Sequence, residues 1–280
     1  MMGVTLASIA GLGAMVGAIY ASGEKGKQLN FFVWKVLAGK AHGGQRINVD
    51  EASIYYETYG KGSPVLVLHG GLGSLKDMSS QIIALSASHY VVAPDSRGHG
   101  RSTDSSAPLS YSIMAGDALA ILDRLHLDRV DVVGWSDGGI VGLDLAMRYP
   151  DRIRRLVAIS ANYDVDGLVE IPSSAGKIPR RSVGYALFAP DPAHWPTLYR
   201  KVVTLWQTQP HYTLNDLRRI KAPALIMAGE RDIVKREHTD ELTKSILNSQ
   251  ESIIENATHL VIHEKPEVVN YHISMFLDAR

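Results

Sequence analysis

The sequence predicts an α/β domain whose mostly parallel, doubly wound sheet is covered by helices. Short β-branched runs, such as the one formed by Val130, Val132 and Val133, fit strands that are buried on both faces. Amphipathic stretches of helical spacing alternate with these runs, and this alternation is typical of a parallel sheet. The chain has 280 residues, of which 45% are hydrophobic, so it can bury the core that such a fold needs.

Charge and cysteine content narrow the possible functions. The 29 Lys and Arg residues balance the 29 Asp and Glu residues, which provides no excess of positive charge for a polyanion, so we expect no nucleic-acid partner. The chain has no cysteine, which excludes disulfides, thiolate metal sites and cysteine nucleophiles. The scattered His and Asp residues lack the spacing of metal ligands, so we predict neither a metal site nor a cofactor.

Residues 1–28 are predicted to form an apolar membrane segment or a signal. Residues 3–22 are uncharged and rich in Gly and Ala, and a membrane-spanning helix needs about 20 such residues. Ala21-Ser22-Gly23 resembles a signal cleavage site, although no Lys or Arg precedes the apolar run. Several lysines follow it, which would keep the folded domain cytoplasmic. We therefore predict a membrane-associated protein anchored through residues 3–22, with export after cleavage or a soluble helix as alternatives. Residues 29–44 are expected to be a linker or an amphipathic segment.

The folded domain is predicted to span residues 45–280 and to begin with an antiparallel strand pair. The alternating runs 46–49 and 53–59 flank Asp50-Glu51, as in a hairpin. Runs 64–68 and 90–93 are predicted to be buried strands, and residues 113–127 an amphipathic helix. A strand beginning at Val130 and a helix over 140–147 follow, and Pro150 prevents that helix from continuing.

The alternation stops after the sixth predicted strand, at residues 156–159. Residues 161–212 contain several X-Pro turns, many aromatic side chains and no clean strand, which predicts a short helical lid inserted into the domain. An unstructured loop of about 50 residues would be rare in a compact domain. The alternation resumes with a strand at 224–228, a helix at 235–247, a strand at 252–255 and a final helix at 266–277.

A Gly-x-Ser-x-Gly motif, Gly134-Trp135-Ser136-Asp137-Gly138, lies between a predicted strand and a predicted helix. This context is typical of a nucleophile elbow, in which a strained, tight turn lifts the serine oxygen clear of the sheet. The glycines leave space where a Cβ would collide with the neighbouring strand or helix. The alternative is a glycine-rich turn whose serine only caps the helix.

A serine nucleophile needs a base, and the base needs an orienting acid. His259 follows the last predicted strand and Asp232 follows the strand before it. Because open α/β sheets build their sites at the carboxyl ends of strands, we predict His259 as the base and Asp232 as the acid. His263 and Asp164 are the respective alternatives. The order Ser, Asp, His is the one expected for this type of elbow.

From about Arg46 onward the chain resembles the α/β-hydrolase superfamily. The resemblance rests on motifs spread over the domain: His69-Gly70-Gly71, Pro94-Asp95-Ser96-Arg97-Gly98-His99-Gly100-Arg101-Ser102, Gly134-Trp135-Ser136-Asp137-Gly138-Gly139, Gly229-Glu230-Arg231-Asp232 and Ala257-Thr258-His259. The elbow is similar to that of valacyclovir-hydrolase-like carboxylesterases. The resemblance implies a Ser136–Asp232–His259 triad, with the N–H groups of Gly71 and Asp137 as the oxyanion hole. A serine rather than an aspartate at the elbow disfavours the haloalkane dehalogenase and epoxide hydrolase branches.

The predicted function is the cleavage of a small carboxylic ester through an acyl-enzyme. The alternatives are a carbon–carbon bond hydrolase, a lactonase or an acyltransferase with the same triad, and a non-catalytic ligand-binding protein. The carboxylate of Asp137 either attracts a cationic substrate group or complements the dipole of the helix that follows. Large side chains near the elbow or in the predicted lid either line the substrate pocket or bind the lid to the core: Leu72, Trp135, Tyr185, Phe188, Trp195 and Trp206.

Overall fold

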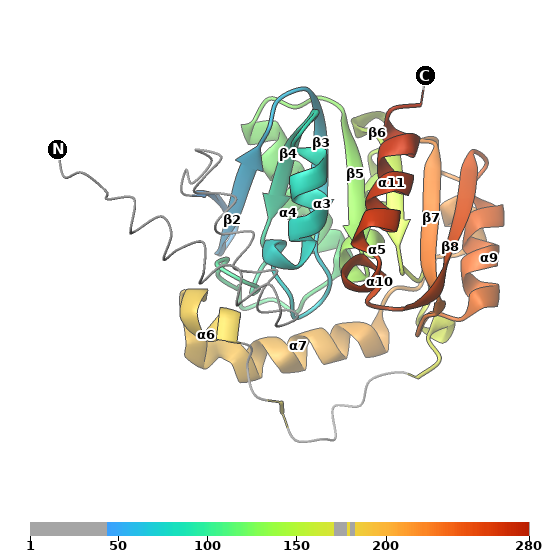
Figure 1. Cartoon of the computed structure of the whole chain (residues 1–280). Helices are drawn as coiled ribbons and strands as arrows, with labels where there is room; N and C mark the ends of the chain where they lie inside the picture. The colour runs from blue at the N-terminus through green and yellow to red at the C-terminus, as the bar shows by residue number, and fades with distance from the viewer. Residues whose placement is uncertain (1–43, 171–177, 180–182, 280) are drawn as a thin grey trace, which may run out of the picture. The chain divides into compact units, whose positions relative to one another are not determined.

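An eight-stranded sheet forms the centre of the domain (Figure 1). The computed structural model describes residues 44–170, 178–179 and 183–279. The strand order is β1-β2-β4-β3-β5-β6-β7-β8; β1 and β2 run antiparallel to their neighbours, and the pairs from β4 to β8 are parallel. The strands are β1 (Gln45–Val49), β2 (Ala52–Tyr59), β3 (Ser63–Leu68), β4 (His89–Pro94), β5 (Val130–Trp135), β6 (Ile153–Ile159), β7 (Ala224–Arg231) and β8 (Ser249–Thr258).

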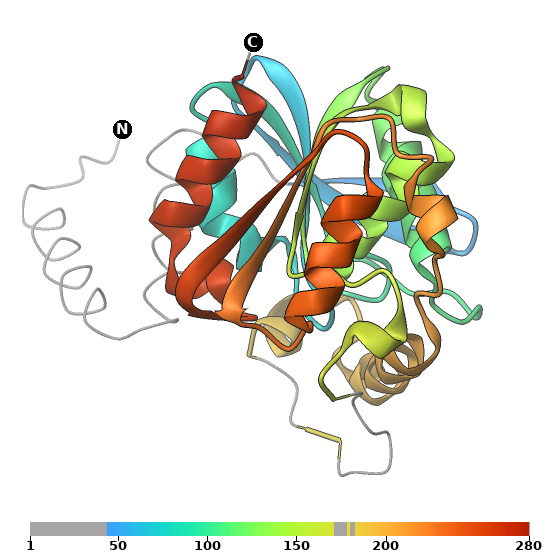
Figure 2. The same cartoon turned by 90° about the vertical axis from the view of Figure 1, so that its right-hand side faces the viewer.

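Helices cover both faces of the sheet (Figures 1 and 2). The α-helices are α3 (Ser79–Leu85), α4 (Tyr111–Arg124), α5 (Asp137–Arg148), α6 (Val183–Phe188), α7 (Trp195–Thr208), α8 (Leu214–Leu217), α9 (Arg236–Ser245), α10 (Val261–Glu264) and α11 (Pro266–Leu277). Short 3₁₀ helices lie in the connections: η1 (Leu75–Met78), η2 (Pro150–Arg152), η3 (Val165–Gly167) and η4 (Pro192–His194). Helices α3 and α11 pack together on one face, and α4, α5 and α9 lie on the other. The predicted doubly wound α/β fold is therefore confirmed.

Strand β5 lies at the centre of the sheet, and every one of its residues is buried. It pairs in parallel with β3 and β6, so that Val133 lies opposite Val67 on one side and Val157 on the other. A strand buried on both faces requires apolar, β-branched side chains, which explains the run that begins at Val130. Because β5 ends inside this rigid core, Ser136, the next residue, is held at a fixed place at the carboxyl edge of the sheet.

The segment between β6 and β7 contains η3, α6, η4 and α7. Helix α7 runs past the end of the sheet at which β5 stops (Figure 1). One stripe of this helix is buried in the hydrophobic core, because Leu198, Val202 and Leu205 recur at helical spacing. This apolar stripe holds α7 against the rest of the domain.

Several element boundaries differ from the predicted ones. Strand β6 begins at Ile153, whereas the prediction began it at Leu156. Arg154 interrupts the apolar pattern in the sequence, but in the structure its guanidinium pairs with Asp131 of β5. Strand β8 extends over residues 249–258, because an edge strand tolerates polar side chains on its open side. Helix α4 ends at Arg124, whereas the prediction extended it to residue 127. The apolar spacing continues beyond Arg124, but His126 adopts a left-handed φ of 55°, which does not fit a helix. The seven-residue helix α3 is absent from the sequence prediction, because it is too short to establish a helical period.

The predicted membrane-associated localisation is wrong on the present findings. Across residues 44–170, 178–179 and 183–279, no helix is both long enough and apolar enough to cross a bilayer. The apolar run 3–22 and the segment 29–44, from which that prediction came, lie outside the described residues.

Candidate active site

The backbone at Ser136 is strained in the way that a nucleophile elbow requires. Ser136 connects β5 to α5 and has φ 54° and ψ −122°, a region that side-chain-bearing residues rarely adopt. A Cβ on Gly134 would lie 2.1 Å from the carbonyl oxygen of Gly138, and a Cβ on Gly138 would lie 2.3 Å from that of Leu68. Both contacts are with backbone atoms that cannot rotate away. Only glycine therefore fits on either side of this turn.

Ser136, His259 and Asp232 form one hydrogen-bonded line. The Ser136 Oγ lies 2.9 Å from His259 Nε2, and His259 Nδ1 lies 2.7 Å from Asp232 Oδ1. An ionised carboxylate only accepts hydrogen bonds, so the proton of the neutral ring belongs on Nδ1. The free lone pair of Nε2 then faces the serine hydroxyl, which is the arrangement that a general base needs.

The acid is fixed by additional donors. Ser160 donates its hydroxyl to Asp232 Oδ2 at 2.6 Å, and the backbone N–H of Val234 donates to Oδ1 at 3.2 Å. Burial alone would raise the pKa of Asp232, but the hydrogen bonds from His259, Ser160 and Val234 hold it below its ordinary value. Asp232 therefore stays ionised at neutral pH and can stabilise a protonated His259.

Each member of this line follows a different parallel strand. Ser136 follows β5, Asp232 follows β7 and His259 follows β8, so the shared carboxyl edge of the sheet gathers residues that are far apart in sequence. The two alternative residues have other partners. Asp164 caps η3 and lies 2.9 Å from His211 Nδ1, whereas His263 packs edge-on against Trp135.

The loop after β3 lies against the start of α5. Asp137 is the first residue of α5, where backbone N–H groups have no acceptor within the helix and favour an anion. A Cβ on Gly71 would lie only 2.4 Å from Asp137 Oδ2, so the backbone of this loop approaches Asp137 directly. The next residue, Leu72, has a left-handed φ of 58°, which turns the chain away from this contact.

Two buried histidines fix the loops around the site. His69 accepts a hydrogen bond from the N–H of Ser96 at Nε2, and its Nδ1 lies 2.7 Å from the carbonyl oxygen of Gly70. Its ring lies against that of His99, with centroids 5.4 Å apart. Burial lowers the pKa of each imidazole to about 4, so both rings are neutral and serve to join the loops that follow β3 and β4.

The Asp137 carboxylate is itself enclosed. The residue is 6% exposed, and its carboxylate accepts hydrogen bonds from Trp206 Nε1 at 2.9 and 3.1 Å and from the Tyr111 hydroxyl at 3.1 Å. Burial raises the pKa of Asp137 to about 6, although both donors act in the opposite direction. Sequence reasoning missed Tyr111 and the link from Trp206 to Asp137, because no local pattern connects α4 or α7 to the elbow.

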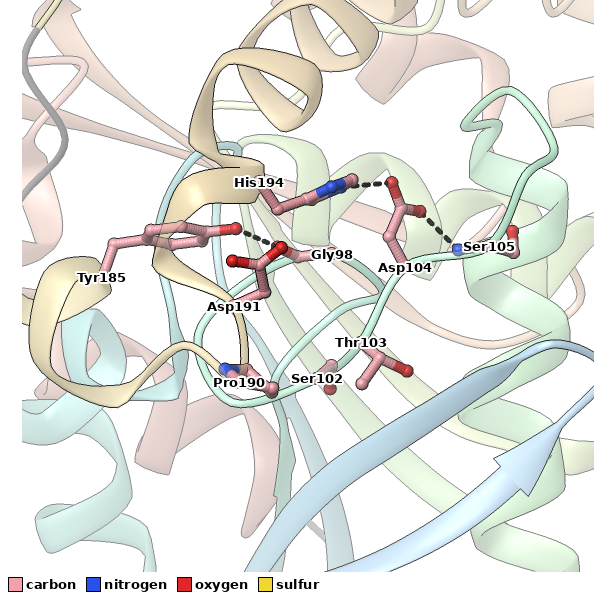
Figure 3. Close-up of a pocket in the computed structure, with 9 residues that line it drawn as sticks. All are labelled: Gly98, Ser102, Thr103, Asp104, Ser105, Tyr185, Pro190, Asp191 and His194. Atoms are coloured by element: carbon pink, nitrogen blue, oxygen red, sulfur yellow. Dashed lines mark hydrogen bonds and ion pairs between the residues drawn. The ribbon is translucent and has the colours of Figure 1, made fainter.

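The other predicted pocket residues are divided between two regions. Trp135 adjoins the line through its Nε1, which donates to the carbonyl oxygen of His259 at 2.9 Å. Tyr185 and Trp195 pack against each other away from this line, and Phe188 lies against the cationic groups of Lys76 and Arg101. Tyr185 lines a separate cavity of about 280 Å³ together with Asp104, Asp191 and His194 (Figure 3). Tyr185 donates to the carbonyl oxygen of Gly98 and Phe188 contacts Lys76 and Arg101, so both reach outside the predicted lid segment, whereas the ring contacts of Trp195 are with Tyr185 and Tyr199 of the same segment.

A family model described as the alpha/beta hydrolase family matches residues 65–270. The chain belongs to the alpha/beta hydrolase family. Among residues 44–170, 178–179 and 183–279, this family member has no group of three or more His, Cys, Asp or Glu side chains that could hold a metal ion.

Curated relatives agree with this assignment, and solved structures share the fold. The chain is 31% identical to the human serine hydrolase BPHL over 232 residues, which cover 76% of this chain and 79% of the relative. It is 36% identical to a putative carbamate hydrolase RutD of Azorhizobium caulinodans over 129 residues, 46% of each chain, so it spans less than half the length of that relative. A putative lipase of Acinetobacter baumannii has the same fold, with a TM-score of 0.72 and 21% identity, over 90% of this chain and 95% of the lipase.

Proposed function

We propose that this member of the family is a serine hydrolase that cleaves carboxylic esters with a Ser136–His259–Asp232 triad. The observation that carries the proposal is the continuous hydrogen-bonded line from the Ser136 hydroxyl to the Asp232 carboxylate. Its relatives include proteins named as a serine hydrolase and as a putative carbamate hydrolase. Both are named as hydrolases, and a Ser–His–Asp arrangement is suited to attack on an acyl carbon.

The first half-reaction acylates the serine. Ser136 Oγ attacks the carbonyl carbon of the ester while His259 Nε2 takes the hydroxyl proton, and the carbonyl oxygen becomes an oxyanion. The N–H groups of Gly71 and Asp137 are proposed to stabilise this oxyanion, each contributing about 3 kcal/mol to the transition state. His259 then returns the proton to the leaving alcohol as the carbon–oxygen bond breaks, which leaves an acyl-Ser136 ester.

The second half-reaction uses water in place of the serine. His259 takes a proton from water, the resulting hydroxide attacks the acyl carbon, and the collapse of the second oxyanion releases the carboxylic acid. The proton on His259 returns to Ser136 Oγ. Throughout, Asp232 holds the imidazole in the correct tautomer and stabilises its protonated form, without itself taking up the proton.

The direct test is the variant Ser136→Ala. We expect turnover of a short acyl ester to fall about 10⁴- to 10⁶-fold, because the covalent step is lost, while the melting temperature stays close to that of the wild type. Ser106→Ala is the matched control, since Ser106 is an exposed serine that donates only to Glu51. Near-normal esterase activity of the Ser136 variant would refute the proposed function.

A second experiment identifies the class of substrate that the proposed triad cleaves. A panel of aliphatic esters of increasing chain length, amino-acid esters, lactones, vinylogous 1,5-diketones and alkyl carbamates separates the ester hydrolase from the other reactions that the same triad supports. Carbamates are the second candidate, because the relative from Azorhizobium caulinodans is named as a putative carbamate hydrolase. We expect the highest kcat/KM with an ester, and a carbamate preference of tenfold or more would shift the assignment.

A further inference from the structure

Helix α7 places one side chain against both residues of the proposed oxyanion hole. The indole Nε1 of Trp206 donates to the two carboxylate oxygens of Asp137, at 2.9 and 3.1 Å. The same ring borders Gly71, because a Cβ on that glycine would lie 2.6 Å from Trp206 Cζ2. One lid-segment side chain therefore contacts the loop after β3 and the first residue of α5 together.

These contacts prevent the Gly71 backbone from moving toward Asp137 and Trp206. The Asp137 carboxylate and the indole ring both lie where a Cβ on Gly71 would project, at 2.4 Å from Oδ2 and 2.6 Å from Cζ2. The Asp137 side chain is held in turn by Tyr111 of α4, so it cannot follow a displacement of the loop. The distance between the two proposed N–H donors is thus set by a contact between Gly71, Asp137 and Trp206.

We infer that Trp206 is a positioning residue that holds the oxyanion hole in its productive geometry through its contacts with Asp137 and Gly71. This inference rests on the proposed function. Oxyanion donors act through short, aligned hydrogen bonds, and a misplacement of about 1 Å can cost a factor of about 100 in rate. Removal of the indole donor also takes a hydrogen bond from the buried carboxylate oxygen that lies directly beside Gly71.

The variant Trp206→Phe tests the inference, because it keeps a flat aromatic ring at this position of α7 and removes the N–H donor. We expect kcat to fall about 10- to 100-fold while KM changes less than about threefold, since the contact acts on the transition state rather than on ground-state binding. Trp206→His restores an N–H on a smaller ring and should recover part of the lost kcat. An unchanged kcat in both variants would overturn the inference.

A control on the same helix separates positioning from a general loosening of α7. Lys201 donates to Asp104 Oδ2 and to the carbonyl oxygens of Ser105 and Ala107, at 2.6–2.8 Å. Lys201→Met therefore removes more hydrogen bonds between α7 and the core than Trp206→Phe does, without touching Gly71 or Asp137. We expect kcat of this control within about twofold of the wild type. A loss equal to that of Trp206→Phe would mean that α7 acts only by being seated, and the specific role of Trp206 would be refuted.

A double-mutant cycle then tests whether Trp206 acts through Asp137. In an Asp137→Ala background the indole N–H has no carboxylate to hold, so Trp206→Phe should change kcat less than about twofold. If Trp206→Phe lowers kcat in that background as much as in the wild type, Trp206 does not act through Asp137.

The failure of this inference can be distinguished from that of the proposed function. Each variant is treated with a fluorophosphonate, which reacts with an activated serine. Labelling of Ser136 in the wild type together with wild-type kinetics in Trp206→Phe would reject the inference alone. Absence of labelling at Ser136 in the wild type would reject the proposed function and the inference with it.

Discussion

Asp137 is a buried carboxylate directly beside the proposed nucleophile, and its surroundings explain several sequence choices. Gly71 lacks a side chain because Asp137 and Trp206 occupy the space that a Cβ would need. Tyr111 and Trp206 each supply a donor, so the enclosed carboxylate keeps hydrogen-bond partners in place of water. The surroundings of Asp137 therefore depend on individual residues: a glycine that leaves space for its carboxylate, and two side chains that donate hydrogen bonds to it.

The raised pKa of Asp137 predicts how its contribution to stability depends on pH. Burial raises this pKa from 3.8 to about 6, so the folded chain holds this proton more tightly than the unfolded chain does. The contribution of Asp137 to stability is therefore complete below about pH 4 and is lost as pH rises through about 6, by about 3 kcal/mol. We expect the free energy of unfolding of the wild type, minus that of Asp137→Asn, to fall between pH 4 and pH 6. Urea unfolding at closely spaced pH values measures this difference, and a flat or rising difference would contradict the assigned shift.

Strands β3 and β5 and helix α5 meet at the elbow with almost no space between their backbones. Gly138 of α5 lies against the carbonyl oxygen of Leu68, the last residue of β3, and Gly134 lies against Gly138 itself. The close approach allows Ser136 to project from the edge of the sheet. The Gly-x-Ser-x-Gly motif is therefore needed for the close packing of these elements as well as for the chemistry of Ser136.

Two glycine variants test this packing. Gly138→Ala brings a Cβ to 2.3 Å from a backbone oxygen, so α5 must shift, and we expect a loss of about 1–3 kcal/mol of stability together with most activity. Gly116→Ala is the matched control within α4, where a Cβ would meet no atom within 4 Å. Replacing a glycine inside a helix in this way should stabilise the protein by about 0.5–1 kcal/mol. Equal melting temperatures for the two variants would contradict the packing account.

For the domain as a whole, the fold and the hydrogen-bonded line could be predicted because both depend on local signals. Buried β-branched runs identify the parallel strands, and the residues directly after β5, β7 and β8 meet at one edge in any fold of this kind. The chain positions of Ser136, Asp232 and His259 were therefore sufficient to expect their proximity.

Contacts made by the segment between β6 and β7 were not predictable in the same way. Trp206 and Trp195 are both aromatic residues of α7, and nothing in their local sequence shows that one contacts Asp137 while the other contacts Tyr185. Which tryptophan contacts Asp137 depends on how the apolar stripe of α7 packs against the core. That packing involves residues far apart in the sequence. Ser160 was missed for a related reason, since its role depends on Asp232, 72 residues later in the chain.

Ser136 is proposed to be a nucleophile that His259 and Asp232 activate. The most direct measurement is mass spectrometry of the intact chain after reaction with a fluorophosphonate. We expect one adduct per chain, located on Ser136, and a rate of labelling at least about 10³-fold slower in His259→Ala, because the hydroxyl then lacks its base. An adduct on another residue, or equal labelling rates in the wild type and in His259→Ala, would contradict the claim.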